Sequence, residues 1–86
     1  MVIKKNYIVY PNPFENEIHI KTDQDAKVNL YNLEGKSLYS FSVKKGENQI
    51  ILNELFSCEA KMHLGIYILE IKSRNSIERI KLLKTN

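Results

Sequence analysis

The sequence predicts an all-β fold, a small antiparallel sandwich or barrel of about seven strands. Short segments in which apolar and polar residues alternate recur along the chain, and turn-forming residues separate them about every 8–12 residues. No segment keeps a 3.6-residue period, which excludes helices longer than a turn or two. With 86 residues, the chain has the length of one domain with one modest core.

The first half of the chain supplies four candidate strands. Residues 7–10 form a short apolar segment before two prolines, and residues 17–22 then alternate strictly. Residues 26–31 repeat the alternation, and residues 37–43 follow the turn "NLEGK". The side chains expected to point inward from the last three segments are Ile18, Ile20, Ala26, Val28, Leu30, Tyr39, Phe41 and Val43.

A fifth strand is expected after a polar turn. The segment "KKGENQ" predicts that turn over residues 44–49, and the strand follows over residues 50–55. Ile50 and Leu52 are its expected inward residues. Residues 55–64, "LFSCEAKMHL", have weak helical propensity and are expected to form a loop with at most one helical turn.

The last two strands and the three glycines complete the pattern. Residues 65–72, "GIYILEIK", are apolar enough for a central strand covered on both faces, and "SRNS" turns the chain into residues 77–84. Gly35 and Gly46 fall where tight hairpins are expected, and Gly65 begins a strand. No phosphate-binding glycine motif is present.

Pro11-Asn12-Pro13 forms a rigid corner between the first two candidate strands. Each proline holds its own φ near −65° and lacks an N–H, so neither can donate a hydrogen bond to a sheet. The residue before each proline is biased toward extended conformations. We expect this corner to set the angle at which the sandwich begins, and Phe14 to fill the end of the core.

Composition narrows the classes of function. The net charge of +3 comes without any run of more than two Lys or Arg residues, which argues against a nucleic-acid-binding surface. No apolar run approaches the roughly 18–20 residues of a membrane helix, and the first residues lack the features of a signal peptide. The single cysteine, Cys58, cannot form an internal disulfide. No cofactor is expected.

Five blocks together carry a family resemblance. In chain order they are "YPNPFENEIHI", "VNLYNLEGKSL", "KKGENQIILNEL", "GIYILEIK" and "IKLLK". The chain resembles the type A C-terminal sorting domain of the type IX secretion system (the Por secretion system sorting domain) of Bacteroidetes-type Gram-negative bacteria. The resemblance implies a seven-stranded Ig-like sandwich. It places sorting-motif positions at Pro11, Asn12, Pro13, Asn32, Gly35, Gly65, Tyr67, Lys81 and Lys84.

Two departures from the family pattern stand out. The mid-domain turn has Asn32 where an Asp is commoner. Family members reach the "GxY" motif soon after the preceding strand, whereas here residues 56–64 intervene between Leu55 and Gly65. An insertion in a surface loop adds little closure entropy, so the fold is expected to tolerate it.

The resemblance implies a sorting role and no catalysis. Residues 7–86 would be the sorting domain, and residues 1–6 a linker to an N-terminal cargo or a remnant of cloning. Such domains are exported to the periplasm and recognised by the outer-membrane machinery. A sortase-like peptidase then removes them, and the cargo is anchored at the cell surface or released. We expect the edge of the last strand to pair with a strand of that machinery, because exposed edges offer unpaired backbone groups.

Catalytic or metal-binding alternatives have simpler explanations. Cys58 and His63 lie five residues apart, yet a nucleophile or metal site would need further groups, so ordinary loop residues are expected. His19 is expected to be a solvated side chain on the outer face of its strand. Glu15 and Glu17 flank a turn, where acidic residues are common.

Aromatic and basic residues allow binding interpretations as well. The tyrosines could form a strip for stacking, although half-buried tyrosines at the rim of the core are the commoner arrangement. The lysines suggest a solvated face that could also meet an acidic partner. The residues concerned are Tyr7, Tyr10, Tyr31, Tyr39 and Tyr67, and Lys44, Lys45, Lys81 and Lys84.

Two functional classes therefore remain open. One is a sorting signal read by secretion machinery, and the other is an Ig-like accessory module for adhesion or carbohydrate binding in an extracellular protein. A sorting domain must end at the natural C-terminus, and the chain stops two residues after "KLLK". That position favours sorting.

Overall fold

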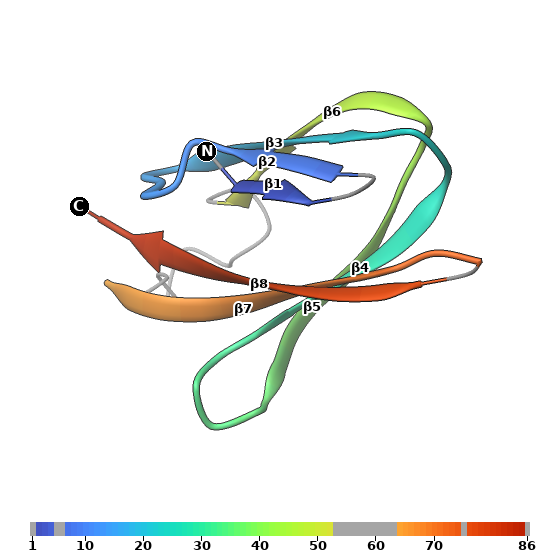
Figure 1. Ribbon diagram of the computed structural model, residues 1–86. Coiled ribbons are helices and arrows are strands. Elements are labelled where there is room, and N and C mark those ends of the chain that lie inside the picture. The colour runs from blue at the N-terminus through green and yellow to red at the C-terminus, as the bar shows by residue number, and fades with distance from the viewer. Residues whose placement is uncertain (1, 5–6, 53–63, 75, 86) are drawn as a thin grey trace.

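A computed structural model describes residues 2–4, 7–52, 64–74 and 76–85 of the chain (Figure 1). These residues form eight strands in two four-stranded sheets, which face each other as the layers of a sandwich. The predicted all-β sandwich is confirmed. No described segment is a helix long and apolar enough to cross a membrane. The strands are β1 (Val2–Lys4), β2 (Tyr7–Tyr10), β3 (Glu17–Thr22), β4 (Ala26–Tyr31), β5 (Ser37–Val43), β6 (Gly46–Ile51), β7 (Gly65–Lys72) and β8 (Ile77–Lys84).

The strands divide between the sheets by crossovers of the chain. Sheet 1 has the order β1-β2-β3-β6, sheet 2 has the order β5-β4-β7-β8, and all neighbours are antiparallel. The chain passes from sheet 1 to sheet 2 after β3 and returns after β5 (Figure 1). The register pairs Val9 with Ile20 in sheet 1 and Leu30 with Leu69 in sheet 2, so buried residues meet across each ladder.

One core lies between the sheets. The inward residues predicted from the alternation are all buried or packed against it, and Phe14 at its end is fully buried. Alternation explains this, because successive side chains of a strand point to opposite faces. The core consists of Tyr7, Val9, Phe14, Ile18, Ile20, Ala26, Val28, Leu30, Val43, Leu52, Tyr67, Leu69, Ile71, Ile80 and Leu82, with Leu38, Tyr39, Phe41 and Ile50 packed against it.

Strand β6 begins earlier than the sequence predicts. The strand expected over residues 50–55 starts at Gly46, which pairs with Thr22 of β3. Residues 46–49 are Gly, Glu, Asn and Gln, which have low intrinsic preference for strands, so local pattern indicates a turn. Pairing with β3 overrides that preference, and the turn shrinks to Lys44 and Lys45.

The short turn before β6 is closed by the side chain of Asn48. Lys44 N donates to Asn48 Oδ1 at 3.1 Å, and Asn48 Nδ2 donates to Lys44 O at 2.7 Å. Gly46 has a φ of 109°, a region that side chains with a Cβ rarely adopt. Gly46 ends a crossover between the sheets and is not part of the predicted hairpin, since β5 pairs with β4 and β6 pairs with β3.

Strand β7 is central, as predicted, but only one of its faces is fully covered. It lies between β4 and β8, and Tyr67, Leu69 and Ile71 are buried in the core. Ile66 and Ile68 point to the other face, where they are only half-buried. The expectation of cover on both faces was therefore wrong, because no layer of the described chain lies outside sheet 2 (Figure 1).

Candidate functional site

Seven of the nine motif positions meet at one end of the sandwich. Gly65 of β7 pairs with Lys84 of β8, and the Pro11–Phe14 corner lies along the outer edge of the same end of β8. Motif positions distant in the sequence are thus neighbours: Asn12 and Lys81, which are 69 residues apart, are joined by a hydrogen bond. The other two positions, Asn32 and Gly35, lie in the β4–β5 turn.

The side chain of Asn12 occupies the place of a strand residue beside β8. Its Nδ2 donates to Lys81 O at 3.0 Å, and its Oδ1 accepts from Leu83 N at 3.0 Å. A primary amide presents a donor and an acceptor side by side, as a peptide group does. The corner can therefore satisfy the strand edge even though its two prolines have no N–H to offer.

Phe14 continues the same contact with its backbone. Phe14 N donates to Leu83 O at 2.8 Å, and Phe14 O accepts from Thr85 N at 2.8 Å. Phe14 and Lys84 thus form a short parallel bridge, while the Phe14 ring is fully buried. We call the contacts of Asn12 and Phe14 with Lys81, Leu83 and Thr85 the edge clamp.

The edge clamp restricts where the last strand could pair with a strand of a partner. From Lys81 to Thr85 the outer edge of β8 is already paired with the chain itself. Only the part of the edge around Ile77 and Arg79 remains without a neighbouring strand in the described chain. A partner strand could add to β8 near Lys84 only by displacing the corner.

The two motif lysines of β8 face opposite sides. Lys81 is exposed on the outer face of sheet 2, whereas Lys84 is 5% exposed on the inner side. Lys84 Nζ lies 5.9 Å from the centre of the Phe14 ring and donates to Thr85 O at 3.3 Å. A spacing of three residues along a strand requires this split, because side chains alternate. Lys84 supports the clamp, and Lys81 is available to solvent.

The β4–β5 turn is held by the side chain of Asn32. Its Oδ1 accepts from Glu34 N and from Lys36 N, each at 2.9 Å, and Gly35 N donates to Asn32 O at 3.0 Å. Gly35 has a φ of 85°, which favours glycine. In both hydrogen bonds to the Asn32 side chain, the acceptor is its Oδ1, and its amide nitrogen takes no part. An Asp can supply that oxygen equally well, which explains why Asn32 can replace the commoner residue.

The "GxY" positions have structural roles. Gly65 has a φ of 132°, and a Cβ there would meet nothing within 4 Å. Backbone conformation, rather than lack of space, is what favours glycine at this position. Tyr67 is 7% exposed and forms part of the core.

A cluster on the outer face of sheet 1 was not foreseen from the sequence. The rings of Tyr10 and His19 stack, with centroids 4.9 Å apart and an interplanar angle of 8°. His19 Nε2 lies 3.3 Å from Glu17 Oε2, and His19 Nδ1 lies 3.7 Å from Glu47 Oε1. Tyr10 OH donates to Glu47, a hydrogen bond that raises the pKa of Tyr10. The residues come from three strands, so only the sheet register brings them together.

This cluster offers no metal centre. The two carboxylates contact opposite nitrogens of the imidazole, so they do not share one point with it. Within the described residues, no group of three His, Cys, Asp or Glu side chains could hold a metal ion. Glu17 is further engaged by Gln49 Nε2, which donates to it at 2.5 Å. Cys58 and His63, the other candidate pair, lie outside the described residues.

The tyrosines do not form a binding strip. Tyr7 and Tyr67 are buried, and Tyr7 OH lies 3.3 Å from Ser76 Oγ. Tyr10 lies on the outer face of sheet 1, Tyr31 on that of sheet 2, and Tyr39 packs against the core. They therefore point into three separate environments.

The comparisons with known proteins agree with this geometry. A family model described as "Secretion system C-terminal sorting domain" matches residues 8–85, which include both halves of the edge clamp. No curated protein matches the chain.

Proposed function

Because the chain belongs to the secretion system C-terminal sorting domain family, we propose that it directs an attached N-terminal cargo across the outer membrane through the type IX secretion system. The family is not an enzymatic one. The observation that carries the proposal is the edge clamp, which joins the motif residues Asn12 and Lys81 by a hydrogen bond. The separated tyrosines give no support to a carbohydrate-binding accessory module.

We further propose that a sortase-like peptidase removes the domain and that the cargo is anchored at the cell surface or released. Residues 7–86 form the proposed sorting unit, preceded by a linker over residues 1–6. Within that linker, Val2–Lys4 forms β1 against β2 and extends sheet 1. Cleavage in this region would therefore follow the release of a short edge strand.

An export assay tests the proposed function. Residues 6–86 are fused to a periplasmic reporter in a strain with a working type IX system, and the reporter is followed in the periplasm, at the surface and in the medium. We expect surface or medium localisation, with loss of mass equal to that of the domain. The matched control is the same fusion in a strain whose type IX translocon is deleted. Reporter that stays in the periplasm of the competent strain would contradict the proposal.

A further inference from the structure

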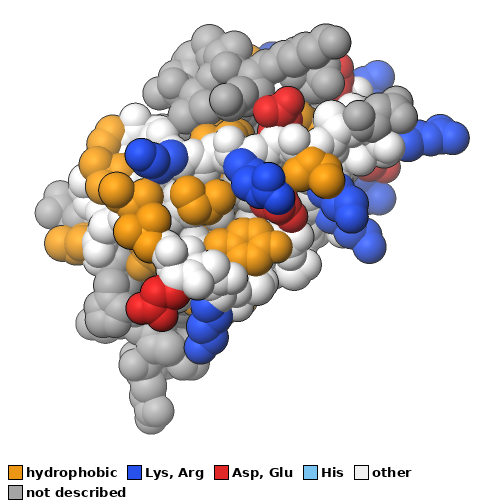
Figure 2. All heavy atoms as spheres, turned by 60° about the horizontal axis from the view of Figure 1, so that its bottom comes forward, with side chains coloured by type: hydrophobic (Ala, Val, Ile, Leu, Met, Phe, Trp, Pro, Cys, Tyr) orange, Lys and Arg blue, Asp and Glu red, His pale blue; other side chains and the backbone are white. Residues whose placement is uncertain are grey.

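The outer face of sheet 2 has two chemically different ends. We call it the sheet-2 face; it is formed by alternate residues of β4, β7 and β8, with the serines of β5 at its margin. Seen from this side, most hydrophobic side chains lie toward one end and most lysines and arginines toward the other (Figure 2). The division is not complete, because Lys81 is the register partner of Ile68 and the exposed Ile77 is that of Lys72. The charged residues on it are Lys27, Lys72, Arg79 and Lys81 against Glu70.

The basic end places two lysines directly opposite each other. Lys27 of β4 and Lys72 of β7 are partners in the sheet register, and like charges in that position destabilise a sheet. Within the described chain neither forms an ion pair, and Glu70 is engaged by Arg79, whose Nε lies 3.1 Å from its Oε2. The pair therefore lacks an internal counter-charge among the described residues.

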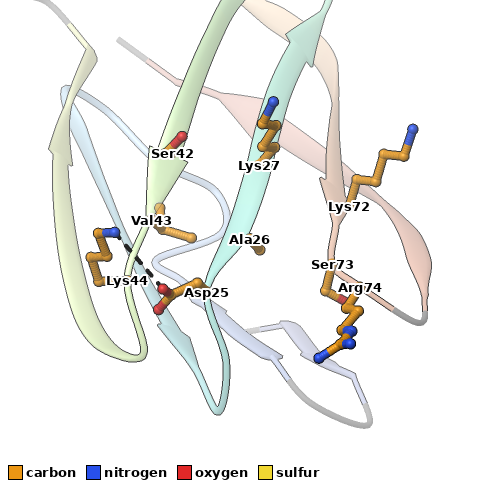
Figure 3. A pocket seen from close by; sticks show the side chains of 9 residues that line it. All are labelled: Asp25, Ala26, Lys27, Ser42, Val43, Lys44, Lys72, Ser73 and Arg74. Carbon is orange, nitrogen blue, oxygen red and sulfur yellow. Dashed lines mark ion pairs between the residues drawn. The ribbon is translucent and has the colours of Figure 1, made fainter.

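A hollow of about 480 Å³ lies at this end, bordered by Lys27, Lys72 and Arg74 (Figure 3). Its one carboxylate, Asp25, is engaged by Lys44 Nζ at 3.8 Å and by Lys45 N at 2.9 Å (Figure 3). Lys27 and Lys72 extend to the same side of this view and Arg74 to the other, whereas Lys44 points toward Asp25 (Figure 3). An acidic group of a partner could approach them without displacing a described carboxylate.

The opposite end of the face is richer in apolar side chains, with Lys81 beside them as the register partner of Ile68. Ile66 of β7 and Leu83 of β8 are register partners, and Leu83 is 40% exposed. Ile68, the next outward residue of β7, is half-buried. Leu33 and Leu64, in the segments that border this end, are 67% and 65% exposed. Exposed apolar side chains that gather in one region mark an interaction surface.

The outer face of sheet 1 differs in charge. On β3 and β6 it carries Glu17 and Glu47 against Lys21, with His19 between the two carboxylates. Among the described strand residues, the surplus of positive charge on an outer face thus belongs to sheet 2, which also carries the exposed Leu83.

We propose that the sheet-2 face docks onto an acidic protein surface that has an apolar patch beside its carboxylates, on the export machinery of the proposed function. The inference rests on that function and names the surface through which it acts. Charge complementarity at the Lys27–Lys72 end gives orientation and rate of encounter, and burial of Leu83 and Ile66 gives affinity. The free edge of β8 is not needed for this mode of contact.

Charge neutralisation tests the basic end in the export assay. The double variant Lys27→Gln/Lys72→Gln is compared with Lys21→Gln/Lys36→Gln, which removes the same charge from sheet 1 and the β4–β5 turn. We expect the exported fraction to fall about tenfold for the first pair and to stay near wild type for the second. Folding is not the cause if the first pair unfolds no more easily than wild type, as removal of a like-charge pair predicts. Equal export by both pairs would overturn the proposal.

A substitution matched in exposure tests the apolar end. Leu83→Thr on the sheet-2 face is compared with Ile51→Thr on sheet 1, where the wild-type side chains are 40% and 39% exposed. The backbone bonds of Leu83 to the edge clamp remain possible in the variant. We expect Leu83→Thr to lower export about fivefold and Ile51→Thr to leave it unchanged. An equal effect of both would overturn the proposal.

Measurements on the purified domain test two other binding partners for the sheet-2 face, a second copy of the chain and a lipid surface. Sedimentation that shows a dimer, lost in Leu83→Thr, would make the occupant a second copy and overturn the proposal. Binding to vesicles containing anionic phospholipid, lost in Lys27→Gln/Lys72→Gln, would do the same in favour of a lipid surface. A wild-type fusion that is not exported refutes the proposed function, whereas variants exported as well as wild type refute only this inference.

Discussion

At position 12, an asparagine side chain does what a peptide group does in a sheet. Its amide donates to Lys81 O and accepts from Leu83 N, both at 3.0 Å. The prolines on either side have no N–H, so the side chain is the group at this corner that can both donate and accept. At the scale of single residues, the corner is therefore a substitute for a strand.

Replacing Asn12 with Leu should lower the free energy of unfolding by about 1 kcal/mol, because Leu83 N and Lys81 O exchange a protein partner for water. Urea unfolding followed by circular dichroism measures the change. The control is Asn29→Leu, a half-buried asparagine on the outer face of β4, with an expected change within about 0.5 kcal/mol. Equal losses in the two variants would show that the side-chain hydrogen bonds of Asn12 do not account for the loss of stability.

Tyr10 should ionise at a higher pH than a free tyrosine in an alkaline spectrophotometric titration. Its hydrogen bond to Glu47 raises the pKa above the ordinary value of 10.0, and the charge of Glu47 acts in the same direction. A folded-state pKa that is raised gives stability that is present below pH 10.0 and is lost as the pH rises through the folded value. Glu47→Gln should move this ionisation back toward the ordinary value. A titration curve unchanged by Glu47→Gln would contradict the assignment.

At the scale of elements, β8 is an edge strand with two different halves. Alternation sends Lys81 outward and Lys84 inward, and the edge clamp covers the backbone from Lys81 to Thr85. Around Ile77 and Arg79 no strand of the described chain lies alongside. One strand thus combines a closed end, next to the corner, with an open end.

Hydrogen exchange should separate these two halves. The amides of Leu83 and Thr85 are bonded to the corner and should exchange slowly. The amide of Arg79 faces the same edge, because backbone groups of alternate residues point to the same side, and it should exchange fast. In the Asn12→Leu variant the Leu83 amide should exchange fast, whereas the Thr85 amide should still exchange slowly because it donates to Phe14 O. Slow exchange of Arg79 in the isolated domain would contradict the open end.

At the scale of the whole molecule, the outer faces of the two described sheets differ in charge. The sheet-2 face carries four cations and one carboxylate, whereas the carboxylates Glu17 and Glu47 lie on sheet 1. Two sheets in face-to-face contact leave two outer faces, and here each has its own charge and its own apolar content. This separation allows one face to dock while the other remains in solvent.

The like-charge pair should make stability depend on salt. Lys27→Gln/Lys72→Gln should raise the free energy of unfolding by about 0.2–1 kcal/mol at low ionic strength. The gain should fade near 1 M salt, where the Debye length is about 3 Å. Thermal unfolding at several salt concentrations measures both effects, with Lys21→Gln/Lys36→Gln as the comparison. A gain that persists unchanged at high salt would exclude charge repulsion as its cause.

Local pattern was sufficient for much of the fold. The alternation in residues 17–22, 26–31 and 37–43 specifies which side chains are buried, because a one-residue slip would reverse every one of them. Local pattern failed at β6, where the polar residues 46–49 enter a strand through pairing with β3. Propensity describes isolated segments, and an available edge can outweigh it.

The sequence by itself determined the sandwich, its inward residues, the rigid corner and, through five short blocks, the family to which the chain belongs. The tertiary structure decided what the corner contacts. Asn12 and Leu83 are 71 residues apart, and no local rule predicts which strand edge an amide will meet. It also decided that Lys27 faces Lys72 and that Glu17 and Glu47 flank His19, since cross-strand neighbours depend on the order and register of strands.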